Sequence, residues 1–209
     1  MYFPSEPAVS DISNEDQARA DHYALLSRLF YAPPDAPLLT RLAAASSALR
    51  QGALAAAWND LCQAATEFTV AAMQEEYAAL FIGVGKPLVV LYASWHLTGF
   101  MMEQPLVRLR SDLASFGLAR NADVAEPEDH IAALMDVMRH LILAPERAEA
   151  ARLELQHQFF FAHISLWHED LWSAIEKQEE ARFYRKVSEF ARRFLDLEEE
   201  LLKTLFSAE

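Results

Sequence analysis

Apolar residues recur at intervals of three and four along most of the chain, which is the spacing of an amphipathic helix. A stripe of this kind near the C-terminus predicts a helix over Glu180–Phe206 that packs on the core, or less favourably forms a dimer seam. A second stripe, capped by Ser13 or Asn14, predicts the first helix over Asn14–Tyr31. The C-terminal stripe consists of Phe183, Val187, Phe190, Phe194, Leu197, Leu201 and Leu205.

Proline and glycine residues divide the chain between these two helices. The chain has only five glycines, and it lacks the alternating pattern and regular turns of a β protein. We therefore predict an all-α, single-domain bundle of about 8–10 helices over residues 14–209, preceded by a flexible N-terminus at residues 1–13. The intervening helices are expected at Pro37–Gln51, Ala53–Glu67, Thr69–Phe81, Gln104–Phe116, Pro127–Leu143, Glu146–Ile164 and Leu166–Gln178.

The segment Ile82–Gly99 differs from the rest because it does not have a helical pattern. It contains three of the five glycines, a proline and the apolar run Leu88–Tyr92. Glycine at such positions usually marks unusual backbone angles or a close approach of two segments. We expect an apolar loop that is buried or covers a groove.

The chain is strongly acidic, with a formal net charge of −13 from 18 basic and 31 acidic residues. This charge disfavours binding to nucleic acid or to anionic membranes, and it either attracts a basic partner or keeps the protein soluble. The single cysteine, Cys62, excludes an intramolecular disulfide and fits a reducing compartment. Met1–Gln17 lacks a secretory signal, and the longest uncharged run, Pro87–Met102, is shorter than the roughly 20 residues of a membrane span. We predict a cytoplasmic protein without stable membrane insertion.

Three weak motifs do not support an enzyme. Gly83–Pro87 lacks the spacing of a phosphate-binding loop, and Ser94 with His96 lacks a nucleophile elbow. Glu154–His157 supplies one Glu-x-x-His unit, whereas a helical di-iron site needs two. The sequence therefore predicts no catalytic residue, no metal site and no cofactor. A helical metal enzyme remains a remote alternative, which metal analysis of the purified protein would test.

The run Glu126-Pro127-Glu128-Asp129-His130 stands before the apolar helical pattern that ends at Leu143. Proline is suited to the first turn of a helix, and the carboxylates suit the positive end of its dipole. Asp129 and His130 place a titratable pair at this helix start. The pair is a candidate for contact with a polar or cationic ligand.

Two segments together resemble the TorD family of helical chaperones, also described as the TorD/DmsD/NarJ group of redox-enzyme maturation proteins. The first box comprises Glu76–Pro87 with Tyr92–Trp95, and it is similar to the family pattern E-Y-x-x-L-F-x-G, followed by P and by S-x-aromatic. The second box, Glu126–His130, is similar to the family pattern E-P-x-D-H. Weaker likeness extends over roughly residues 15–206.

The resemblance implies a cytoplasmic chaperone that binds the twin-arginine signal peptide, or the apo form, of a molybdenum-cofactor oxidoreductase. Such a chaperone assists cofactor insertion and delays export until maturation is complete. Carboxylates would hold guanidinium groups, and aromatic side chains would form the walls of an apolar groove. The peptide-binding residues that the resemblance implies are Tyr77, Phe81, Tyr92, Ser94, Trp95, Glu126, Pro127, Glu128, Asp129 and His130.

Several alternatives stay open at this point. A NarJ-like protein would instead assemble the body of a molybdoenzyme that is not exported. Taken one by one, aromatic residues such as Tyr77, Phe81 and Trp95 are more often part of a core than of a ligand wall, and Glu126 and Glu128 suit simple helix-start charges. Val89–Tyr92 departs from the prolines found in several relatives, which leaves the client undefined. The family includes monomers and domain-swapped dimers, for which Ile82–Gly99 or Leu118–Ala125 are hinge candidates.

Overall fold

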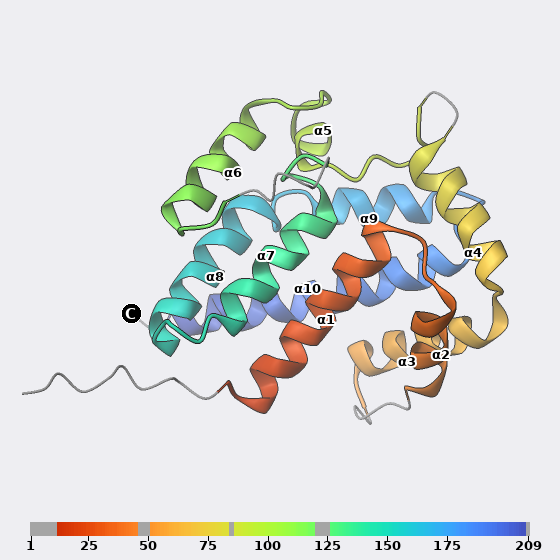
Figure 1. Ribbon diagram of the computed structural model, residues 1–209, viewed down its shortest axis with the longest axis horizontal. Helices are drawn as coiled ribbons and strands as arrows, with labels where there is room; N and C mark the ends of the chain where they lie inside the picture. Colours follow the sequence, from red (N-terminus) through yellow and green to blue (C-terminus); the bar gives the residue numbers. More distant parts are fainter. Residues whose placement is uncertain (1–11, 46–50, 84–85, 120–125, 208–209) are drawn as a thin grey trace, which may run out of the picture.

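The computed structural model describes residues 12–45, 51–83, 86–119 and 126–207 (Figure 1). Within these residues the chain forms ten α-helices and one π-helix and contains no strand, which confirms the all-α prediction. The elements are α1 (Asn14–Tyr31), α2 (Ala36–Ala44), α3 (Ala53–Glu67), α4 (Val70–Tyr77), the π-helix η1 (Ala78–Ile82), α5 (Ala93–Thr98), α6 (Gln104–Ser115), α7 (Ile131–Leu143), α8 (Glu149–His163), α9 (His168–Glu176) and α10 (Phe183–Phe206).

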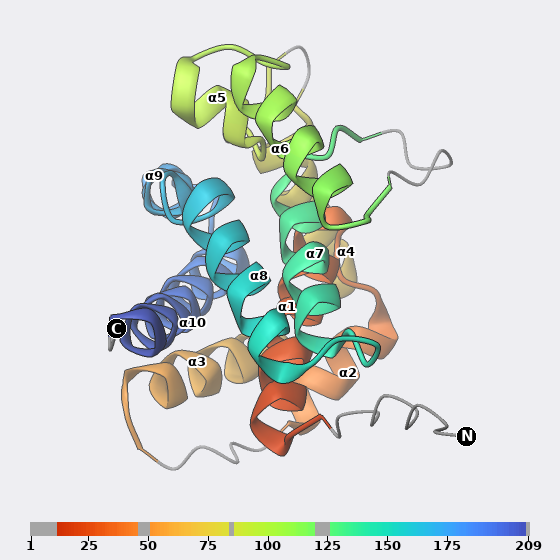
Figure 2. The same ribbon diagram turned by 90° about the vertical axis from the view of Figure 1, so that its left-hand side faces the viewer.

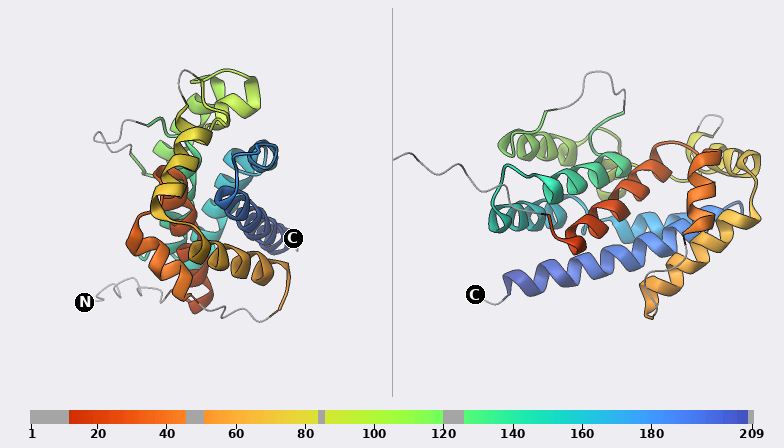
Figure 3. Two further views of the ribbon diagram at one scale, coloured as in Figure 1. Left: turned by 90° about the vertical axis from the view of Figure 1, so that its right-hand side faces the viewer. Right: turned by 60° about the horizontal axis from the view of Figure 1, so that its bottom comes forward.

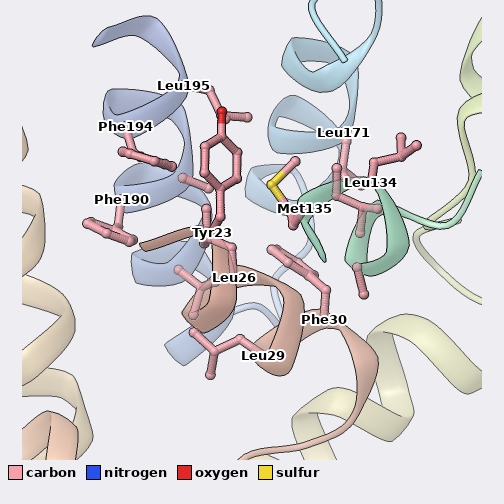
Figure 4. Close-up of a cluster of buried hydrophobic side chains, with 14 of the residues drawn as sticks. Tyr23, Leu26, Leu29, Phe30, Leu134, Met135, Leu171, Phe190, Phe194 and Leu195 are labelled. Atoms are coloured by element: carbon pink, nitrogen blue, oxygen red, sulfur yellow. The ribbon is translucent and has the colours of Figure 1, made fainter. Parts of the chain in front are cut away.

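The core forms around α1, which packs along α7 on one side and contacts α10 on another. Ser13 caps α1, because its side chain accepts a hydrogen bond from the Asp16 backbone N–H at 3.0 Å. The close-up in Figure 4 shows side chains from α1, α7, α9 and α10 meeting in one apolar cluster. The labelled members are Tyr23, Leu26, Leu29, Phe30, Leu134, Met135, Leu171, Phe190, Phe194 and Leu195, all buried.

The longest helix, α10, runs beside α3, α8 and α9 (Figure 3). No side chain at the start of α10 caps its N-terminus. Glu76 of α4 provides the cap instead. The Glu76 carboxylate accepts hydrogen bonds from the backbone N–H groups of Arg182, Phe183 and Tyr184 at 2.9, 3.1 and 2.7 Å. The first residue of the first box is therefore a structural cap that joins two distant segments.

Two predicted elements differ from the structure around the first box. The helix expected over Thr69–Phe81 is α-helical only to Tyr77 and continues as the π-helix η1 to Ile82. The segment Ile82–Gly99, expected to be a loop throughout, contains α5. This helix has only six residues, which is too short to show a periodic pattern in the sequence. Gly99, in the left-handed conformation, ends it.

The helix expected from Pro127 begins at Ile131, so the second box lies in the turn before α7. The helix expected over Pro37–Gln51 ends at Ala44. Residues 1–11 of the expected flexible N-terminus and residues 120–125 of the expected connection Leu118–Ala125 lie outside the described residues. None of the helices in the described part of the chain has the length and apolar character needed to cross a bilayer.

Candidate functional site

The two boxes meet through backbone hydrogen bonds. Tyr92 and His130 form an isolated antiparallel bridge. Beside it, the Ala93 N–H donates to the Asp129 carbonyl at 3.0 Å, and the Ile131 N–H donates to the Leu91 carbonyl at 2.9 Å. The loop before α5 is thus fastened to the start of α7. Figure 2 shows α5 and α6 next to each other at one edge of the molecule, above α7.

Asp129 holds this junction from inside the protein. Only 1% of its surface is exposed, and Ser94 is fully buried. Its Oδ2 atom accepts hydrogen bonds from the Ser94 backbone N–H at 2.9 Å and from the Ser94 hydroxyl. These contacts fix the first turn of α5 relative to α7. Through its side chain, Asp129 therefore holds the loop before α5 against the start of α7.

His130 is the N-cap of α7 and lies beside Tyr92. Its Nδ1 accepts a hydrogen bond from the Ala132 N–H at 3.1 Å, so the proton of the neutral ring is on Nε2. The rings of His130 and Tyr92 meet edge to face, with centroids 5.0 Å apart. Burial lowers the pKa of His130 to about 4, although Glu126 and Asp129 act in the opposite direction. The imidazole is therefore neutral at physiological pH.

A pocket of about 400 Å³ opens beside this junction. Five of the residues expected to bind peptide line it: Tyr77, Phe81, Tyr92, Glu126 and His130. The remaining lining residues are Tyr31, Ala32, Pro33, Ile82, Pro87, Val90 and Leu91. We call this cavity the aromatic pocket, because four of its lining residues are tyrosine or phenylalanine.

The aromatic pocket combines aromatic faces with one carboxylate. Glu126 accepts a hydrogen bond from the Tyr92 hydroxyl, and the Tyr77 hydroxyl donates to the Phe30 carbonyl at 3.0 Å. Burial, with Glu126 nearby, raises the pKa of Tyr77 to about 12 and also raises the pKa of Tyr92. Both hydroxyls therefore remain protonated donors. A carboxylate beside aromatic faces suits a cation, and a flat guanidinium in particular.

The other expected residues lie outside the aromatic pocket. The Glu128 carboxylate accepts two hydrogen bonds from the Arg110 guanidinium, at 3.0 and 2.8 Å. Trp95 is half-buried, and the Lys86 ammonium lies 4.5 Å from its ring centroid. Pro127 is half-buried and accepts a hydrogen bond from the His130 N–H at 3.2 Å. Ser94 and Asp129 are buried at the junction and do not line the aromatic pocket.

Gly83 shapes the loop that forms one side of the aromatic pocket. Its φ angle is +60°, and a Cβ at this position would lie 2.7 Å from the Lys86 carbonyl oxygen. Only glycine fits both conditions. The Gly83 N–H donates to Ala78 and the Val89 N–H to Leu80, each at 2.9 Å, so the loop returns to η1.

Sequence reasoning missed the part of the pocket that comes from the end of α1. Tyr31 is 56% exposed, although it follows a buried aromatic residue. Ala32 and Pro33 are recognisable in sequence only as the end of a helix. An aromatic residue two positions before a proline pair is the one sequence signal that marks this wall.

Within the described residues, no group of three or more His, Cys, Asp and Glu side chains is placed to hold a metal ion. The single Glu-x-x-His unit has other contacts. Glu154 accepts a hydrogen bond from Gln158 at 3.2 Å, and the His157 ring lies against Phe161 and Phe206.

Comparison with known proteins decides the family. The family model described as nitrate reductase delta subunit matches residues 48–173, which include both boxes. The chain belongs to the nitrate reductase delta subunit family. This membership confirms the resemblance to the TorD/DmsD/NarJ group that the two boxes indicated. In this family member, the first box supplies the α10 cap and pocket walls, and the second box supplies the α7 cap and the junction.

Named relatives of this family member are chaperones. It is 25% identical over 137 residues to "Chaperone protein TorD" of Vibrio atlanticus, covering 62% of this chain and 64% of the relative. The alignment thus spans less than two thirds of that relative's length. A second "Chaperone protein TorD", from Colwellia psychrerythraea, is 23% identical, with coverage of 97% of this chain and 99% of the relative.

A solved structure shares the fold of the family member. It is the crystal structure of an Archaeoglobus fulgidus protein described as a redox enzyme maturation protein. The TM-score is 0.57 at 21% identity, covering 95% of this chain and 98% of the other. At this identity the likeness establishes the fold alone.

Proposed function

We propose that this protein is a cytoplasmic chaperone for a molybdenum-cofactor oxidoreductase and that it binds the twin-arginine signal peptide of its client. By holding the leader, it delays export until the cofactor has been inserted into the apo-enzyme. The protein acts by binding and not by catalysis. Family membership and the chaperone names of its relatives support the general role.

The observation that carries the specific proposal is the composition of the aromatic pocket. A twin-arginine leader presents guanidinium groups next to an apolar stretch. The Glu126 carboxylate lies among Tyr77, Phe81 and Tyr92, so a guanidinium can pair with an anion while it stacks on a ring. The apolar remainder of the pocket, with Val90 and Leu91, accommodates neighbouring aliphatic side chains.

Calorimetric titration with synthetic leader peptides tests this function. The first peptide is the leader of a molybdoenzyme encoded next to this protein, and its control has both arginines replaced by alanine. We expect 1:1 binding at micromolar concentration or below, which the control peptide does not show.

The pocket assignment is tested with Glu126→Gln, which keeps the size of the side chain and removes its charge. We expect affinity for the leader to fall about tenfold, since hydrogen bonds to charged groups are stronger than neutral ones. The matched control is Glu146→Gln, in the connection after the opposite end of α7. Equal losses in the two variants would contradict the pocket assignment.

If no leader binds the wild-type protein, signal-peptide recognition is wrong, and the apo catalytic subunit becomes the next ligand to test. Binding to that subunit alone would identify a NarJ-like chaperone for the enzyme body.

A further inference from the structure

A second pocket, of about 260 Å³, lies between α5, α6, α7 and α8. Its walls are largely apolar and include Leu97, Leu109 and Leu134. Ala93 and Asp129, which form the junction beside the aromatic pocket, also line this second pocket. The junction is therefore a wall between two cavities, and the remaining lining residues of the second one lie outside the two boxes.

Asp129, which lines this second pocket, has an unsatisfied carboxylate oxygen. Asp129 uses its Oδ2 atom to bind Ser94, but its buried Oδ1 atom has no hydrogen-bond partner among the described residues. A buried acceptor of this kind costs free energy unless a donor reaches it. Asp129 is 1% exposed and lines the second pocket, so this cavity is a route by which a donor can approach its carboxylate.

The charges around the second pocket favour a cationic donor. Asp112 accepts a hydrogen bond from His163 at 2.8 Å, and burial lowers the pKa of His163, so this histidine is mostly neutral at physiological pH. Arg108 is exposed, and no hydrogen bond among the described residues joins it to Asp129. Two carboxylates and one guanidinium leave a net negative charge in the lining.

The size and surroundings indicate a single long side chain as the occupant. A cavity of about 260 Å³ is smaller than a typical cofactor site. Two of its lining residues, Leu97 and Leu166, are exposed apolar side chains. An apolar polypeptide segment that carries one basic residue matches both the charge and this surface.

We propose that the second pocket binds an arginine or lysine side chain of the client polypeptide, whose cationic end donates to Asp129 Oδ1 while flanking apolar residues cover Leu97 and Leu166. This inference rests on the proposed function, because it takes the client as the partner. It adds a second anchor point, separated from the aromatic pocket by the junction.

The pocket chemistry is tested directly with n-butylguanidinium, a side-chain-sized probe, and with n-butanol as the uncharged control. Methyl resonances of Leu109 and Leu134 report occupancy by NMR. We expect saturable shifts with n-butylguanidinium in the millimolar range, since a small ligand gains little free energy, and none with n-butanol. Asp129→Asn should weaken the probe about tenfold, whereas Arg108→Gln should strengthen it by removing a competing positive charge.

Ala162→Phe provides a variant that leaves the junction intact. Ala162 is an exposed residue of α8 that lines the pocket, so a phenylalanine there fills the cavity. The control is Ala56→Phe, an exposed position on α3. We expect Ala162→Phe to abolish the probe shifts and Ala56→Phe to retain them. Shifts that do not saturate, or that persist in Ala162→Phe, would overturn the proposal and leave water as the partner of Asp129.

The leader peptide separates this inference from the proposed function. If the wild type and both phenylalanine variants bind the leader equally well, the proposed function stands and the second anchor is wrong. If no leader binds but n-butylguanidinium fills the second pocket, the signal-peptide function is wrong and the pocket still takes a basic side chain. If Ala162→Phe loses affinity for the leader and Ala56→Phe does not, the result supports both the proposed function and the second anchor.

Discussion

At the scale of single residues, burial sets the chemistry of the junction. His130 has two acidic neighbours, Glu126 and Asp129, yet desolvation outweighs both and keeps the ring neutral. The same neutral ring accepts the hydrogen bond from Ala132 that begins α7. Protonation would remove this acceptor and place a charge inside the wall between the two pockets.

This environment makes stability depend on pH. The pKa of His130 is about 4 in the folded protein and about 6.5 when unfolded, so the folded state binds fewer protons between these values. The contribution of His130 to the free energy of unfolding is therefore largest above about pH 6.5. It decreases by up to about 3 kcal/mol as the pH falls toward about 4. Urea unfolding at pH 7 and pH 4.5 measures the loss.

His130→Asn isolates the contribution of this residue, because asparagine also caps helices but does not titrate. Other histidines with lowered pKa values, such as His96 and His168, remain in both proteins. We expect a smaller loss of stability in the variant between the two pH values. An identical loss would show that His130 does not carry this pH dependence.

The sequence placed Asp129 and His130 at the same point but did not separate their roles. Both were expected on the first turn of a helix, whereas both precede it. Their roles depend on Ser94 and Tyr92, which lie 35 and 38 residues away in the chain. No local pattern encodes these long-range contacts, so the family motif marked the residues without explaining them.

At the scale of elements, the N-terminus of α10 depends on a residue of α4. Glu76 is 8% exposed and accepts three backbone hydrogen bonds that the helix itself cannot satisfy. Its negative charge also suits the positive end of the helix dipole. This cap sets where α10 lies relative to η1, and therefore where the wall of the aromatic pocket stands.

Glu76→Gln should destabilise the protein by about 1–3 kcal/mol, because the amide loses the charge and turns an N–H group toward other donors. Urea unfolding at neutral pH measures the change. The matched control is Glu75→Gln, its exposed neighbour on α4, which should change stability by less than about 0.5 kcal/mol. Equal effects of the two substitutions would show that the cap is dispensable.

Helices with long apolar stripes were predictable, and α1 and α3 begin and end where expected. The short elements of the site were not. The π-helix η1 spans only five residues, about one turn, which is too short for its wider turn to change the spacing of apolar residues noticeably. The six residues of α5 are too few to show a helical period.

At the scale of the whole molecule, the net charge of −13 acts on any basic client. We expect the dissociation constant of the leader complex to rise several-fold between about 0.05 and 0.5 M NaCl, because salt screens the attraction. Calorimetry across this range measures the effect, and a leader with its arginines replaced by glutamine should show a weaker dependence. A flat response for the wild-type leader would show that charge does not guide binding.

The aromatic pocket itself is a property of the assembled molecule. Its walls come from the end of α1, from η1, from the loop before α5 and from the second box. The family pattern had already indicated η1, the loop before α5 and the second box as parts of the site. The sequence did not predict Tyr31 and Pro33 as pocket residues, because their position depends on how α1 packs along α7.

The wall shared by the two cavities has a thermodynamic consequence. Ala93 and Asp129 border the second pocket, while their chain neighbours Tyr92 and His130 border the aromatic pocket. If occupation of one cavity displaces this wall, the affinity of the other cavity changes, and linkage makes the effect equal in both directions. A client that engages both cavities would then be held cooperatively, and a fragment that engages one would report the state of the other.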